Sequence, residues 1–231
     1  MFSLELSIII PAYLEAKNLE EILPRINKTL DEINVKYEVV VVDTVIPMDN
    51  TMEICRDNNA CYINRQGGND YGDAVRAGIK YAKGRYLVFM DADGSHSPEF
   101  IKYLYNSREG FDVVIASRYV EGGNTENDRL LIFMSKVVNI LYSRFLHLKC
   151  HDVTNSFKLY NAAPLKEVFL VSKNFDIIKE ILVKLIKKNK NLKINEIPYS
   201  FKKRMFGATK RNLFLFSISY IFTLIKLKFM K

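Results

Sequence analysis

The sequence predicts an α/β fold in which a mostly parallel sheet is covered by helices on both faces. Three observations support this fold class. Strand-like and helix-like patterns alternate from the first residues of the chain. The strand-like runs are continuously apolar, as expected for strands that are buried on both faces. The chain has 231 residues, of which 48% are hydrophobic, so it can fill one large core; a disordered or fibrous protein is excluded.

The first half of the chain carries five strand patterns and two helix patterns. Residues 4–10 form an apolar run that ends at Pro11, which predicts a buried strand. Residues 15–33 carry apolar side chains at helical spacing, which predicts a helix. The other expected elements of this half are strands at residues 37–42, 61–63, 86–90 and 111–116 and a helix at residues 71–82.

The second half of the chain is richer in helix. We expect a long helix at residues 129–146, a short strand at 157–160 and an amphipathic helix at 174–188. The last helix has an apolar side with Phe175, Ile178, Ile181, Leu182, Leu185 and Ile186, and a basic side with Lys184, Lys187 and Lys188. No internal repeat or Pro/Gly-rich linker interrupts the sequence, so one continuous domain is the simpler interpretation.

The charge of the chain is unevenly distributed. Thirty-four Lys and Arg against 26 Asp and Glu give a net charge of +8. Residues 184–231 contain 13 Lys or Arg and one acid, Glu196, and carry +12, whereas the rest of the chain carries −4. A basic segment of this kind is typical of contact with phosphates, which leaves nucleic acid, an anionic membrane surface and a phosphorylated substrate open.

The cysteines argue against a secreted disulfide scaffold. Cys55, Cys61 and Cys150 are odd in number and form no C-x-x-C pair. The start of the chain also lacks the pattern of a cleavable leader. We therefore expect three reduced thiols in the cytosol.

Two carboxylates follow the fourth expected strand directly. Ligands bind beyond the carboxyl ends of the strands in parallel sheets, so this position is a candidate site. Asp91 and Asp93 offer the oxygen ligands that Mg²⁺ takes, usually one or two carboxylates together with substrate phosphates. The alternative is an Asp-rich turn in which Asp93 or Ser97 caps a helix that begins at Pro98.

Two more acids follow the first and second strands. Asp43 can accept a hydrogen bond from the edge of a nucleobase, although a turn-forming Asp is the alternative. Glu15 lies four residues beyond Pro11 and could line the same site. Its alternative is an acid in the first turn of a helix, which the helix dipole favours.

Several segments together resemble a known family. Residues 8–15, Asp43, residues 71–78 and residues 89–94 resemble the family-2 glycosyltransferases of the GT-A fold, which is Rossmann-like. Residues 116–123, 151–158 and 197–210 resemble motifs of the dolichol-phosphate mannose synthases and related polyprenyl-phosphate glycosyltransferases, including D-x-T-S-G-F-R and P-x-x-F-x-x-R-x-x-G-x-S-K. The motifs keep the order of the family from Leu6 to about Lys210.

The resemblance implies a donor site for a nucleotide-diphosphate sugar. Asp91 and Asp93 would hold Mg²⁺ or Mn²⁺ on the diphosphate, and Asp43 would contact the base. Ser95 stands where the mannose synthases often have Gln. The implied substrate-binding residues are Pro11, Tyr13, Glu15, Asp43, Asp91, Ala92, Arg118, Ser135, Arg204 and Lys210.

The resemblance also implies a set of cations around the phosphates of donor and acceptor. Arg118, Arg204 and Lys210 would surround them, because a guanidinium donates two parallel hydrogen bonds to phosphate oxygens. Ser135 would lie at the acceptor phosphate. Asp93, Arg118 and Arg204 are the implied catalytic residues, and an exposed basic loop is the alternative for residues 202–204.

The implied reaction is the inverting transfer of a hexose to a polyprenyl phosphate. GDP-mannose is the expected donor, with UDP-glucose as the alternative. A phosphate acceptor is largely a dianion near neutral pH, so a general base is optional. His96 lies beside the expected metal site, and we expect it to be a helix-start residue rather than a base.

The end of the chain predicts contact with a membrane surface. Residues 213–225 are uncharged and aromatic-rich with basic residues on both sides, but they are fewer than the roughly 20 needed to span a bilayer. We expect a glycosyltransferase domain at 1–211 and an interfacial amphipathic helix at 212–231. The chain would bind the cytoplasmic face of a membrane peripherally, with a small membrane subunit as a further expected partner; a core helix is the alternative.

Two other functions compete with this interpretation. A sugar-nucleotide nucleotidyltransferase would need a Gly-rich loop with Lys or Arg after the first strand, and residues 11–15 do not provide one. A non-catalytic module that binds membrane or RNA would explain the altered sequence after Asp43, but Asp91, Asp93 and Arg118 are intact. We therefore expect an enzyme with no nucleic-acid partner.

Overall fold

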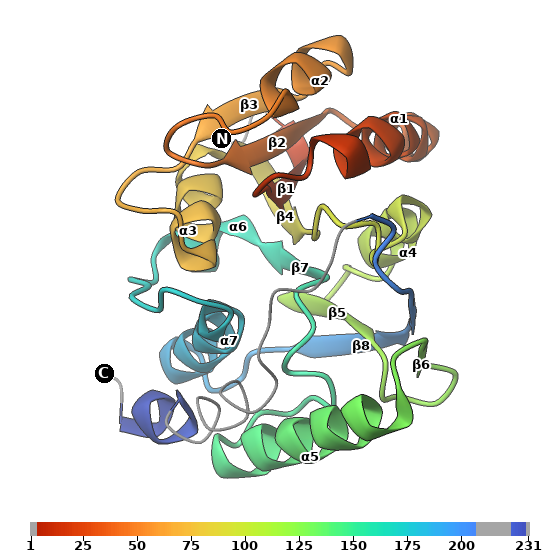
Figure 1. Cartoon of the computed structure of the whole chain (residues 1–231). Helices are drawn as coiled ribbons and strands as arrows, with labels where there is room; N and C mark the ends of the chain where they lie inside the picture. Colours follow the sequence, from red (N-terminus) through yellow and green to blue (C-terminus); the bar gives the residue numbers. More distant parts are fainter. Residues whose placement is uncertain (1–3, 207–222, 230–231) are drawn as a thin grey trace.

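The computed structural model describes residues 4–206 and 223–229 and contains a central seven-stranded sheet (Figure 1). The strand order is β3-β2-β1-β4-β7-β5-β8, and all neighbours are parallel except β7, which runs antiparallel to β4 and β5. The predicted fold class, a mostly parallel sheet between helices, is confirmed. The strands are β1 (Leu4–Pro11), β2 (Tyr37–Asp43), β3 (Cys61–Asn64), β4 (Gly84–Phe89), β5 (Val113–Ser117), β7 (Lys158–Asn161) and β8 (Ile194–Pro198), and a separate two-stranded sheet pairs β6 (Asn124–Thr125) with β9 (Ser200–Phe201).

Helices cover both faces of the sheet (Figure 1). One face packs against α1 (Ala16–Ile33), α2 (Thr51–Asp57) and α4 (Ile101–Asn106), which follows a short 3₁₀ turn at Pro98–Phe100. The other face packs against α3 (Tyr71–Tyr81), α5 (Arg129–Phe145), α6 (Ala162–Lys166) and α7 (Asp176–Lys188).

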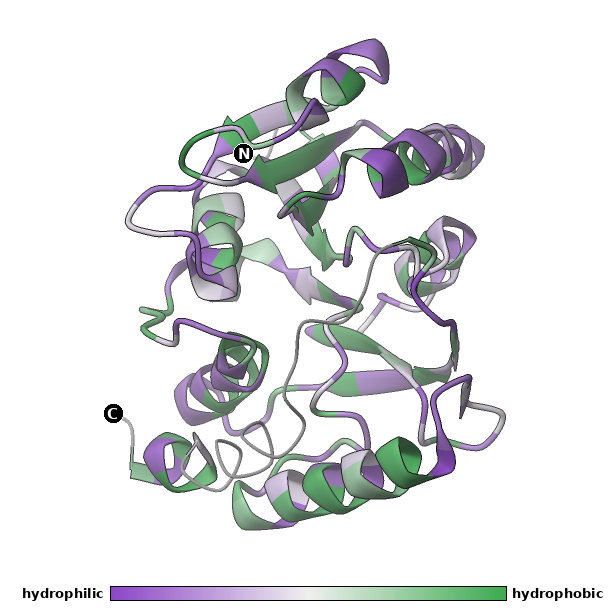
Figure 2. Ribbon diagram, viewed as in Figure 1, coloured by the Kyte–Doolittle hydropathy of each residue, from purple (hydrophilic) through white to green (hydrophobic). Residues whose placement is uncertain are grey.

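Alternate side chains of the same strand serve the two cores. In β1, Ile8 and Ile10 pack with Leu19 of α1, whereas Ile9 packs on the opposite face, with α3. The strand is therefore apolar at successive positions from Ile8 to Ile10, which is the pattern that identified it in the sequence. Figure 2 shows the central strand β2 as predominantly hydrophobic and the outer side of α1 as predominantly hydrophilic.

The order of the strands determines where a ligand can bind. The chain passes from β1 to β2 on one side, and β4 then lies on the other side of β1. At such a switch point the connections leave in opposite directions, so a crevice forms beyond the carboxyl ends of the two strands. Pro11 ends β1 at this edge, and Asp91 follows two residues after the end of β4.

The sequence did not predict several elements. Strand β8 was missed because it is short and carries polar Asn195 and Glu196 among its five residues. Helix α2, in the first half of the chain, was not predicted either. Among the described residues, no helix combines the length and apolar character needed to cross a bilayer.

The described part of the final segment packs on the domain. Residues 223–229 are helical, and Leu227 is wholly buried in the core that contains α7. Ile225 and Phe229 of the same turns are exposed. Residues 207–222, which carry most of the expected interfacial helix, lie outside the described residues, so the division at residue 211 stays a prediction.

A buried polar link joins three strands at their amino ends. The Ser7 hydroxyl donates to the Glu38 carboxylate at 2.6 Å, and it accepts a hydrogen bond from the backbone N–H of Gly84 at 2.8 Å. The same carboxylate oxygen accepts from the N–H of Lys83 at 2.6 Å. One side chain on β1 thus satisfies a carboxylate of β2 and the first residue of β4.

Replacing Ser7 by Ala should destabilise the sheet. The substitution leaves the Gly84 N–H without its acceptor and removes a donor from Glu38, so we expect the free energy of unfolding to fall by about 1–3 kcal/mol. Urea denaturation measures this change. Ser107→Ala, at the partly exposed end of α4, is the control and should change stability by less than about 0.5 kcal/mol. Equal effects in the two variants would contradict the structural role of Ser7.

Candidate active site

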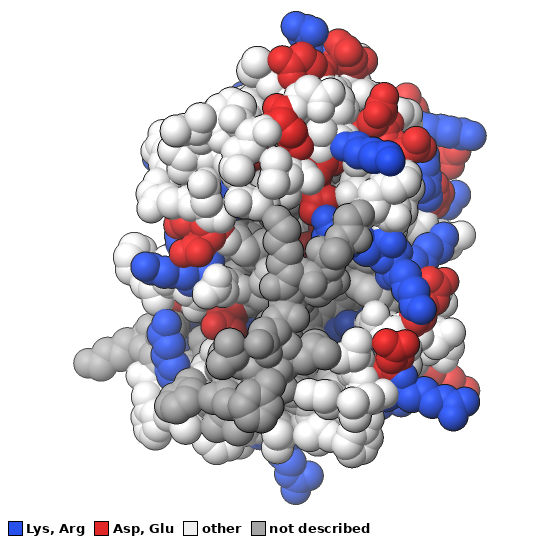
Figure 3. Space-filling view, in the orientation of Figure 1, with Lys and Arg blue, Asp and Glu red and all other residues white. Residues whose placement is uncertain are grey.

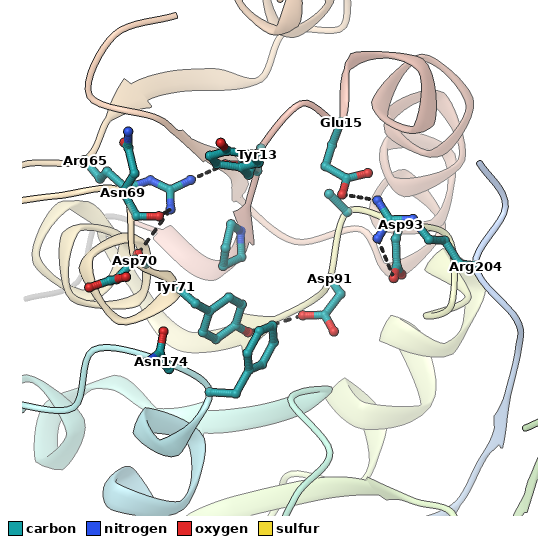
Figure 4. A pocket seen from close by; sticks show the side chains of 14 residues that line it. Tyr13, Glu15, Arg65, Asn69, Asp70, Tyr71, Asp91, Asp93, Asn174 and Arg204 are labelled. Atoms are coloured by element: carbon teal, nitrogen blue, oxygen red, sulfur yellow. Dashed lines mark hydrogen bonds and ion pairs between the residues drawn. The ribbon is translucent and has the colours of Figure 1, made fainter. Parts of the chain in front are cut away.

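A cavity of about 290 Å³ lies at the carboxyl ends of β1 and β4 (Figure 4). Four parts of the chain that are far apart in sequence close around the two strand ends: the segment before α3, the turn after β4, the residues before α7 and the segment at 204. The lining residues are Pro11, Ala12, Tyr13, Glu15, Arg65, Asn69, Asp70, Tyr71, Asp91, Ala92, Asp93, Asn174, Phe175 and Arg204.

The two predicted metal-binding carboxylates both line this cavity. Asp91 accepts a hydrogen bond at Oδ1 from the Tyr71 hydroxyl at 3.2 Å. Asp93 uses Oδ1 to accept from both the N–H and the hydroxyl of Ser95, at 3.0 and 2.5 Å. Its Oδ2 lies 3.4 Å from Nη1 of Arg204. Asp93 therefore organises its own turn and still presents one oxygen to the cavity.

This pair of acids fits a hard divalent cation that also binds substrate phosphates. Mg²⁺ is usually held by one or two carboxylates and by phosphate oxygens, and it retains several waters. Asp91 and Asp93 supply the carboxylates from one short turn. Across the residues that the structure describes, no group of three or more His, Cys, Asp or Glu gathers into a metal site of its own. The two carboxylates suit a cation whose other ligands are phosphate oxygens and water.

Glu15 and Arg204 form the side of the cavity next to Asp93 (Figure 4). Arg204 Nη2 donates to Glu15 Oε1, so one guanidinium lies between two carboxylates. Burial raises the pKa of Glu15 above its ordinary value, although the hydrogen bonds from Arg204 and Asn18 act in the other direction. Leu14 adopts a left-handed conformation with φ 57°, which is rare for a bulky residue and turns the chain between Tyr13 and Glu15 into the site.

Arg204 reaches the site because residues 200–206, the crossing segment, lie over the turn that contains Asp93. The N–H of Met205 donates to the carbonyl of Asp93 at 2.9 Å, and the N–H of Lys202 donates to that of Ser95 at 3.2 Å. Gly94 has φ +78°, which residues with a side chain rarely adopt, and a Cβ there would displace the side chain of Met205. The backbone of the crossing segment is thus fixed against the turn after β4.

The opposite end of the cavity contains residues that sequence reasoning did not single out. Arg65 is buried and donates to the backbone carbonyls of Asp43, Asn69 and Asp70, at 3.0 to 3.1 Å, and also to Ala12. It therefore ties the turns after β1 and β2 to the segment before α3. Burial lowers the pKa of this guanidinium, but a side chain with so high an ordinary value keeps its charge.

Two aromatic rings form the floor beneath Asp91. Tyr71 and Phe175 stack with ring centroids 4.1 Å apart and an interplanar angle of 17°. Phe175 and Asn174 come from the residues just before α7, roughly 100 positions further along the chain. No local pattern identifies them, because only the packing of α7 beside α3 brings them to the cavity.

Asp43 lies at the carboxyl end of β2 but is not among the lining residues. Its side chain is buried and accepts from the Tyr62 hydroxyl at 3.0 Å and from the Thr44 hydroxyl at 3.4 Å. The predicted contact with the nucleobase therefore stays a prediction.

Arg118 lies outside the cavity and is paired with a buried acid. Its Nε and Nη2 donate to the two carboxylate oxygens of Asp152 at 2.8 and 2.7 Å, and Nη2 also donates to the hydroxyl of Thr154 at 2.9 Å. Burial raises the pKa of Asp152, but the charge and hydrogen bonds of Arg118 outweigh it, so this pKa lies below its ordinary value. The guanidinium is thus held in one orientation by the Asp152 loop (residues 151–157).

Ser135 is connected to Arg118 through α5. Asn139 donates to the hydroxyl of Thr154 at 3.0 Å and to the carbonyl of Ser135 at 2.9 Å, and it accepts from the N–H of Thr154 at 3.0 Å. The structure therefore places Arg118 and Ser135 on one hydrogen-bonded network. Their contact with a phosphate stays a prediction, and Lys210 lies outside the described residues.

Lys158 differs from the cation that the family motif carries at this position. Its side chain is wholly buried, and its ammonium group donates to the carbonyl oxygens of Val153 and Asn155. Glu196 holds the other side of the Asp152 loop by accepting from the N–H groups of His151 and Asp152 at 2.6 and 2.9 Å. Lys158 thus supports the loop from inside the protein.

His96 is buried behind the turn and does not line the cavity. Burial lowers the pKa of its imidazole. Its ring stacks on Phe157 with centroids 4.7 Å apart. It does not begin the following helix, because Ser97 precedes the 3₁₀ turn.

Of the predicted substrate-binding residues, seven line the cavity: Pro11, Tyr13, Glu15, Asp91, Ala92, Asp93 and Arg204.

The fold matches solved GT-A structures. Glucosyl-3-phosphoglycerate synthase from Mycobacterium tuberculosis, in complex with Mn²⁺, UDP and phosphoglyceric acid, aligns with a TM-score of 0.75 over 99% of this chain and 80% of that chain at 16% identity. Its complex with Mg²⁺ and UDP gives 0.74, over 97% of this chain and 79% of that chain. At this identity the likeness shows the fold alone.

The sequence assigns the chain to a family within that fold. The chain belongs to glycosyltransferase family 2, because the model of Glycosyl transferase family 2 matches residues 7–169. It is 36% identical to the dolichol-phosphate mannosyltransferase of Pyrococcus furiosus over 218 residues, which are 90% of this chain and 59% of that protein. It is 31% identical to the polyprenol monophosphomannose synthase of Mycolicibacterium smegmatis, over 88% of this chain and 79% of that protein. The family resemblance and the enzyme class are confirmed.

The buried ammonium of Lys158 predicts how stability depends on pH. Burial lowers the pKa of Lys158 to about 8, from an ordinary 10.5. Between these values the unfolded chain binds more protons than the folded chain, so stability rises with pH across this window. Relative to Lys158→Met, which lacks the titrating group, the wild-type free energy of unfolding should rise by a value on the order of 3 kcal/mol.

Urea denaturation of both proteins from pH 7 to pH 10.5 measures this difference. If the difference in the free energy of unfolding between the two proteins did not change with pH, the lowered pKa of Lys158 would be contradicted.

Proposed function

We propose that this chain transfers mannose from GDP-mannose to a polyprenyl phosphate, with inversion at the anomeric carbon. The observation that carries the proposal is the pair Asp91 and Asp93 beside Arg204 in a cavity at the switch point of the sheet. Membership of glycosyltransferase family 2 and the names of the two similar mannosyltransferases support the same reaction. UDP-glucose is the donor to be tested beside GDP-mannose.

The residues of the cavity suit a donor that carries a diphosphate. Asp91 and Asp93 would hold Mg²⁺ or Mn²⁺, which offsets negative charge on the diphosphate when the sugar leaves. Arg204 lies beside Asp93 and can turn its planar donors from Glu15 to a phosphate oxygen. The crossing segment holds the backbone of this arginine, so only its side chain must move.

The acceptor needs little activation by the protein. A phosphate monoester with a second pKa of about 6 is largely a dianion at neutral pH. One of its oxygens would attack the anomeric carbon while the bond from that carbon to the donor phosphate breaks, which inverts the configuration. Consistent with this, the imidazole of His96 is buried behind the site, where it cannot take a proton from the acceptor.

The acceptor phosphate would bind near Arg118 and Ser135. Asp152 fixes the Arg118 guanidinium, and the hydrogen bonds through Asn139 and Thr154 join it to α5. Such a fixed orientation lowers the entropy lost when a phosphate binds. The acceptor's polyprenyl chain would then run along α5.

Helix α5 carries an apolar stripe that supports contact with a membrane (Figure 2). Its sequence contains no Asp or Glu; Arg129 and Lys136 lie along one margin of the stripe, and Arg144 lies in the last turn. The surface of this helix in Figure 3, at the bottom of the view, is mostly white with Lys and Arg at its margin. The exposed apolar residues are Leu130, Phe133, Val137, Ile140, Leu141 and Phe145.

An apolar stripe with basic margins matches the chemistry of an anionic lipid surface. Apolar side chains gain free energy in the acyl boundary, and each Lys or Arg near anionic headgroups adds about 1 kcal/mol. Peripheral binding at the cytoplasmic face, with α5 and residues 212–231 on the lipid, is therefore part of the proposal. A small membrane subunit is a further proposed partner.

Removing the second carboxylate should abolish turnover. We expect Asp93→Ala to lower the rate at least about 100-fold, because one oxygen ligand of the cation is lost. The assay supplies GDP-mannose or UDP-glucose, Mg²⁺ or Mn²⁺, and a short polyprenyl phosphate, and follows the release of nucleoside diphosphate. Glu109→Ala, on the surface after α4, is the control. Wild-type rates for Asp93→Ala, with a normal melting temperature, would refute the assignment.

A charge within the α5 stripe should weaken binding to liposomes. Burying one Phe side chain contributes about 1.5–3 kcal/mol, so Phe133→Asp should lower the partition coefficient onto phosphatidylglycerol vesicles by at least about tenfold. Phe169→Asp is the matched control, because Phe169 is also highly exposed but lies between α6 and α7. Cosedimentation measures both. Equal losses in the two variants would count against α5 as the membrane surface.

A further inference from the structure

His96 occupies an unusual place for a polar side chain. It is wholly buried, three residues beyond Asp93, with its ring stacked on Phe157 and contacted at its edge by Phe201. Both ring nitrogens have partners on different parts of the chain. Nδ1 lies 3.0 Å from the backbone nitrogen of Asp91, and Nε2 lies 3.2 Å from Oδ1 of Asn155.

The partners determine which nitrogen of His96 carries the proton. A backbone N–H can only donate, so Nδ1 must accept from Asp91 and cannot be protonated. The proton then lies on Nε2 and is donated to Asn155. Oδ1 of Asn155 is the acceptor there, since Nδ2 donates to the carbonyl of Ala116 at 2.6 Å and the N–H of Phe157 also points to Oδ1, at 3.3 Å. The imidazole is therefore neutral, and every hydrogen bond has a consistent direction.

The hydrogen bond from the N–H of Asp91 to His96 takes the place of a hydrogen bond to a neighbouring strand, just beyond the end of β4. The N–H of Met90 still donates to the carbonyl of Ile9 in β1, at 3.0 Å. The next N–H, that of Asp91, donates to His96 instead. His96 thus supplies the partner that a neighbouring strand would otherwise provide, and it fixes the backbone from which the Asp91 carboxylate projects.

The contact with Asn155 continues to the acceptor side. The N–H of Asn155 donates to Oδ1 of Asp152 at 3.1 Å, and Asp152 holds Arg118 through two hydrogen bonds. An unbroken series of hydrogen bonds therefore joins the backbone of Asp91 to the guanidinium of Arg118 through a single imidazole.

We propose that His96 is a positioning residue that sets the metal-binding Asp91 and the Asp152 loop in register with each other. This inference rests on the proposed function, because it assigns one end of the series to the donor and the other to the acceptor phosphate. Residues that hold a ligand in place from behind commonly change metal affinity by 10–100-fold when they are lost. His96 touches neither substrate, so its effect passes through Asp91 and through Asn155.

Two substitutions of His96 separate its hydrogen bond with Asp91 from its hydrogen bond with Asn155. In His96→Asn, the side-chain oxygen can occupy the place of Nδ1 and accept from Asp91, but it cannot reach Asn155. In His96→Gln, the longer amide can reach the place of Nε2 and donate to Asn155, but it leaves the N–H of Asp91 without its acceptor. His147→Gln, at an exposed histidine beyond α5, is the matched control.

The first measurement is Mn²⁺ affinity in the presence of GDP or UDP, read from the electron paramagnetic resonance signal of free Mn²⁺. We expect His96→Gln to weaken Mn²⁺ binding about tenfold or more, and His96→Asn to stay close to wild type. The second measurement is the steady-state KM for a short polyprenyl phosphate, which should rise severalfold in His96→Asn while the KM for the donor changes little. The control should match wild type in both.

A third measurement determines which nitrogen of the His96 imidazole carries the proton in the wild-type chain, without substrate or metal. Long-range proton–nitrogen correlation spectra at neutral pH should show one histidine as a neutral ring protonated at Nε2, and this signal should be missing from His96→Asn. A neutral ring protonated at Nδ1 would overturn the inference even if neither variant folds, because Nδ1 could then not accept from the N–H of Asp91.

The remaining outcomes are distinct. Equal Mn²⁺ affinity in wild type and both folded variants would overturn the inference alone, and so would equal losses in both, which would indicate a packing role. A wild-type chain that binds no Mn²⁺ with either nucleotide would overturn the proposed function, and the donor half of the inference with it. Melting temperatures establish whether each variant is folded.

Discussion

Negative charge at the carboxyl edge of the sheet is the constraint on which this site depends. Glu15, Asp91 and Asp93 meet at the ends of β1 and β4, and like charges at short range raise the free energy of the folded state. Arg204 lies between two of these carboxylates, although 111 positions separate it from Asp93 in the chain. The chain must therefore cross back over its own amino-terminal half before the charges are balanced, and under the proposed function a donor-bound cation would release this arginine for the phosphates.

The strands and the central acids could be predicted because both follow from local patterns. Continuous apolar runs identified β1, β2 and β4, and the rule that ligands bind beyond strand ends identified Asp91 and Asp93. Arg65 obeys the same rule, since it follows β3 directly, but that strand is four residues long and partly exposed, so its end attracted no interpretation. Asn174 and Phe175 could not be predicted, because they reach the cavity only through tertiary packing.

The basic residues show what a single sequence leaves open. The sequence shows that a basic side chain is present, whereas burial and geometry determine which anionic group it binds. Arg118 has a buried carboxylate as its partner, and Lys158 points to loop carbonyls inside the protein. The two cations therefore act together on the Asp152 loop, Arg118 through the Asp152 carboxylate and Lys158 through carbonyl oxygens inside the protein.

Gly94 lets the crossing segment lie against the turn after β4. Its φ of +78° lies in the left-handed region, which residues with a side chain rarely adopt, and a Cβ at this position would meet the side chain of Met205. The N–H of Met205 donates to the carbonyl of Asp93, so the two backbones are joined beside this glycine. A residue with a side chain there would strain the turn that carries Asp93 and displace Met205, the neighbour of Arg204, so an uncharged residue helps to keep the arginine beside the acids.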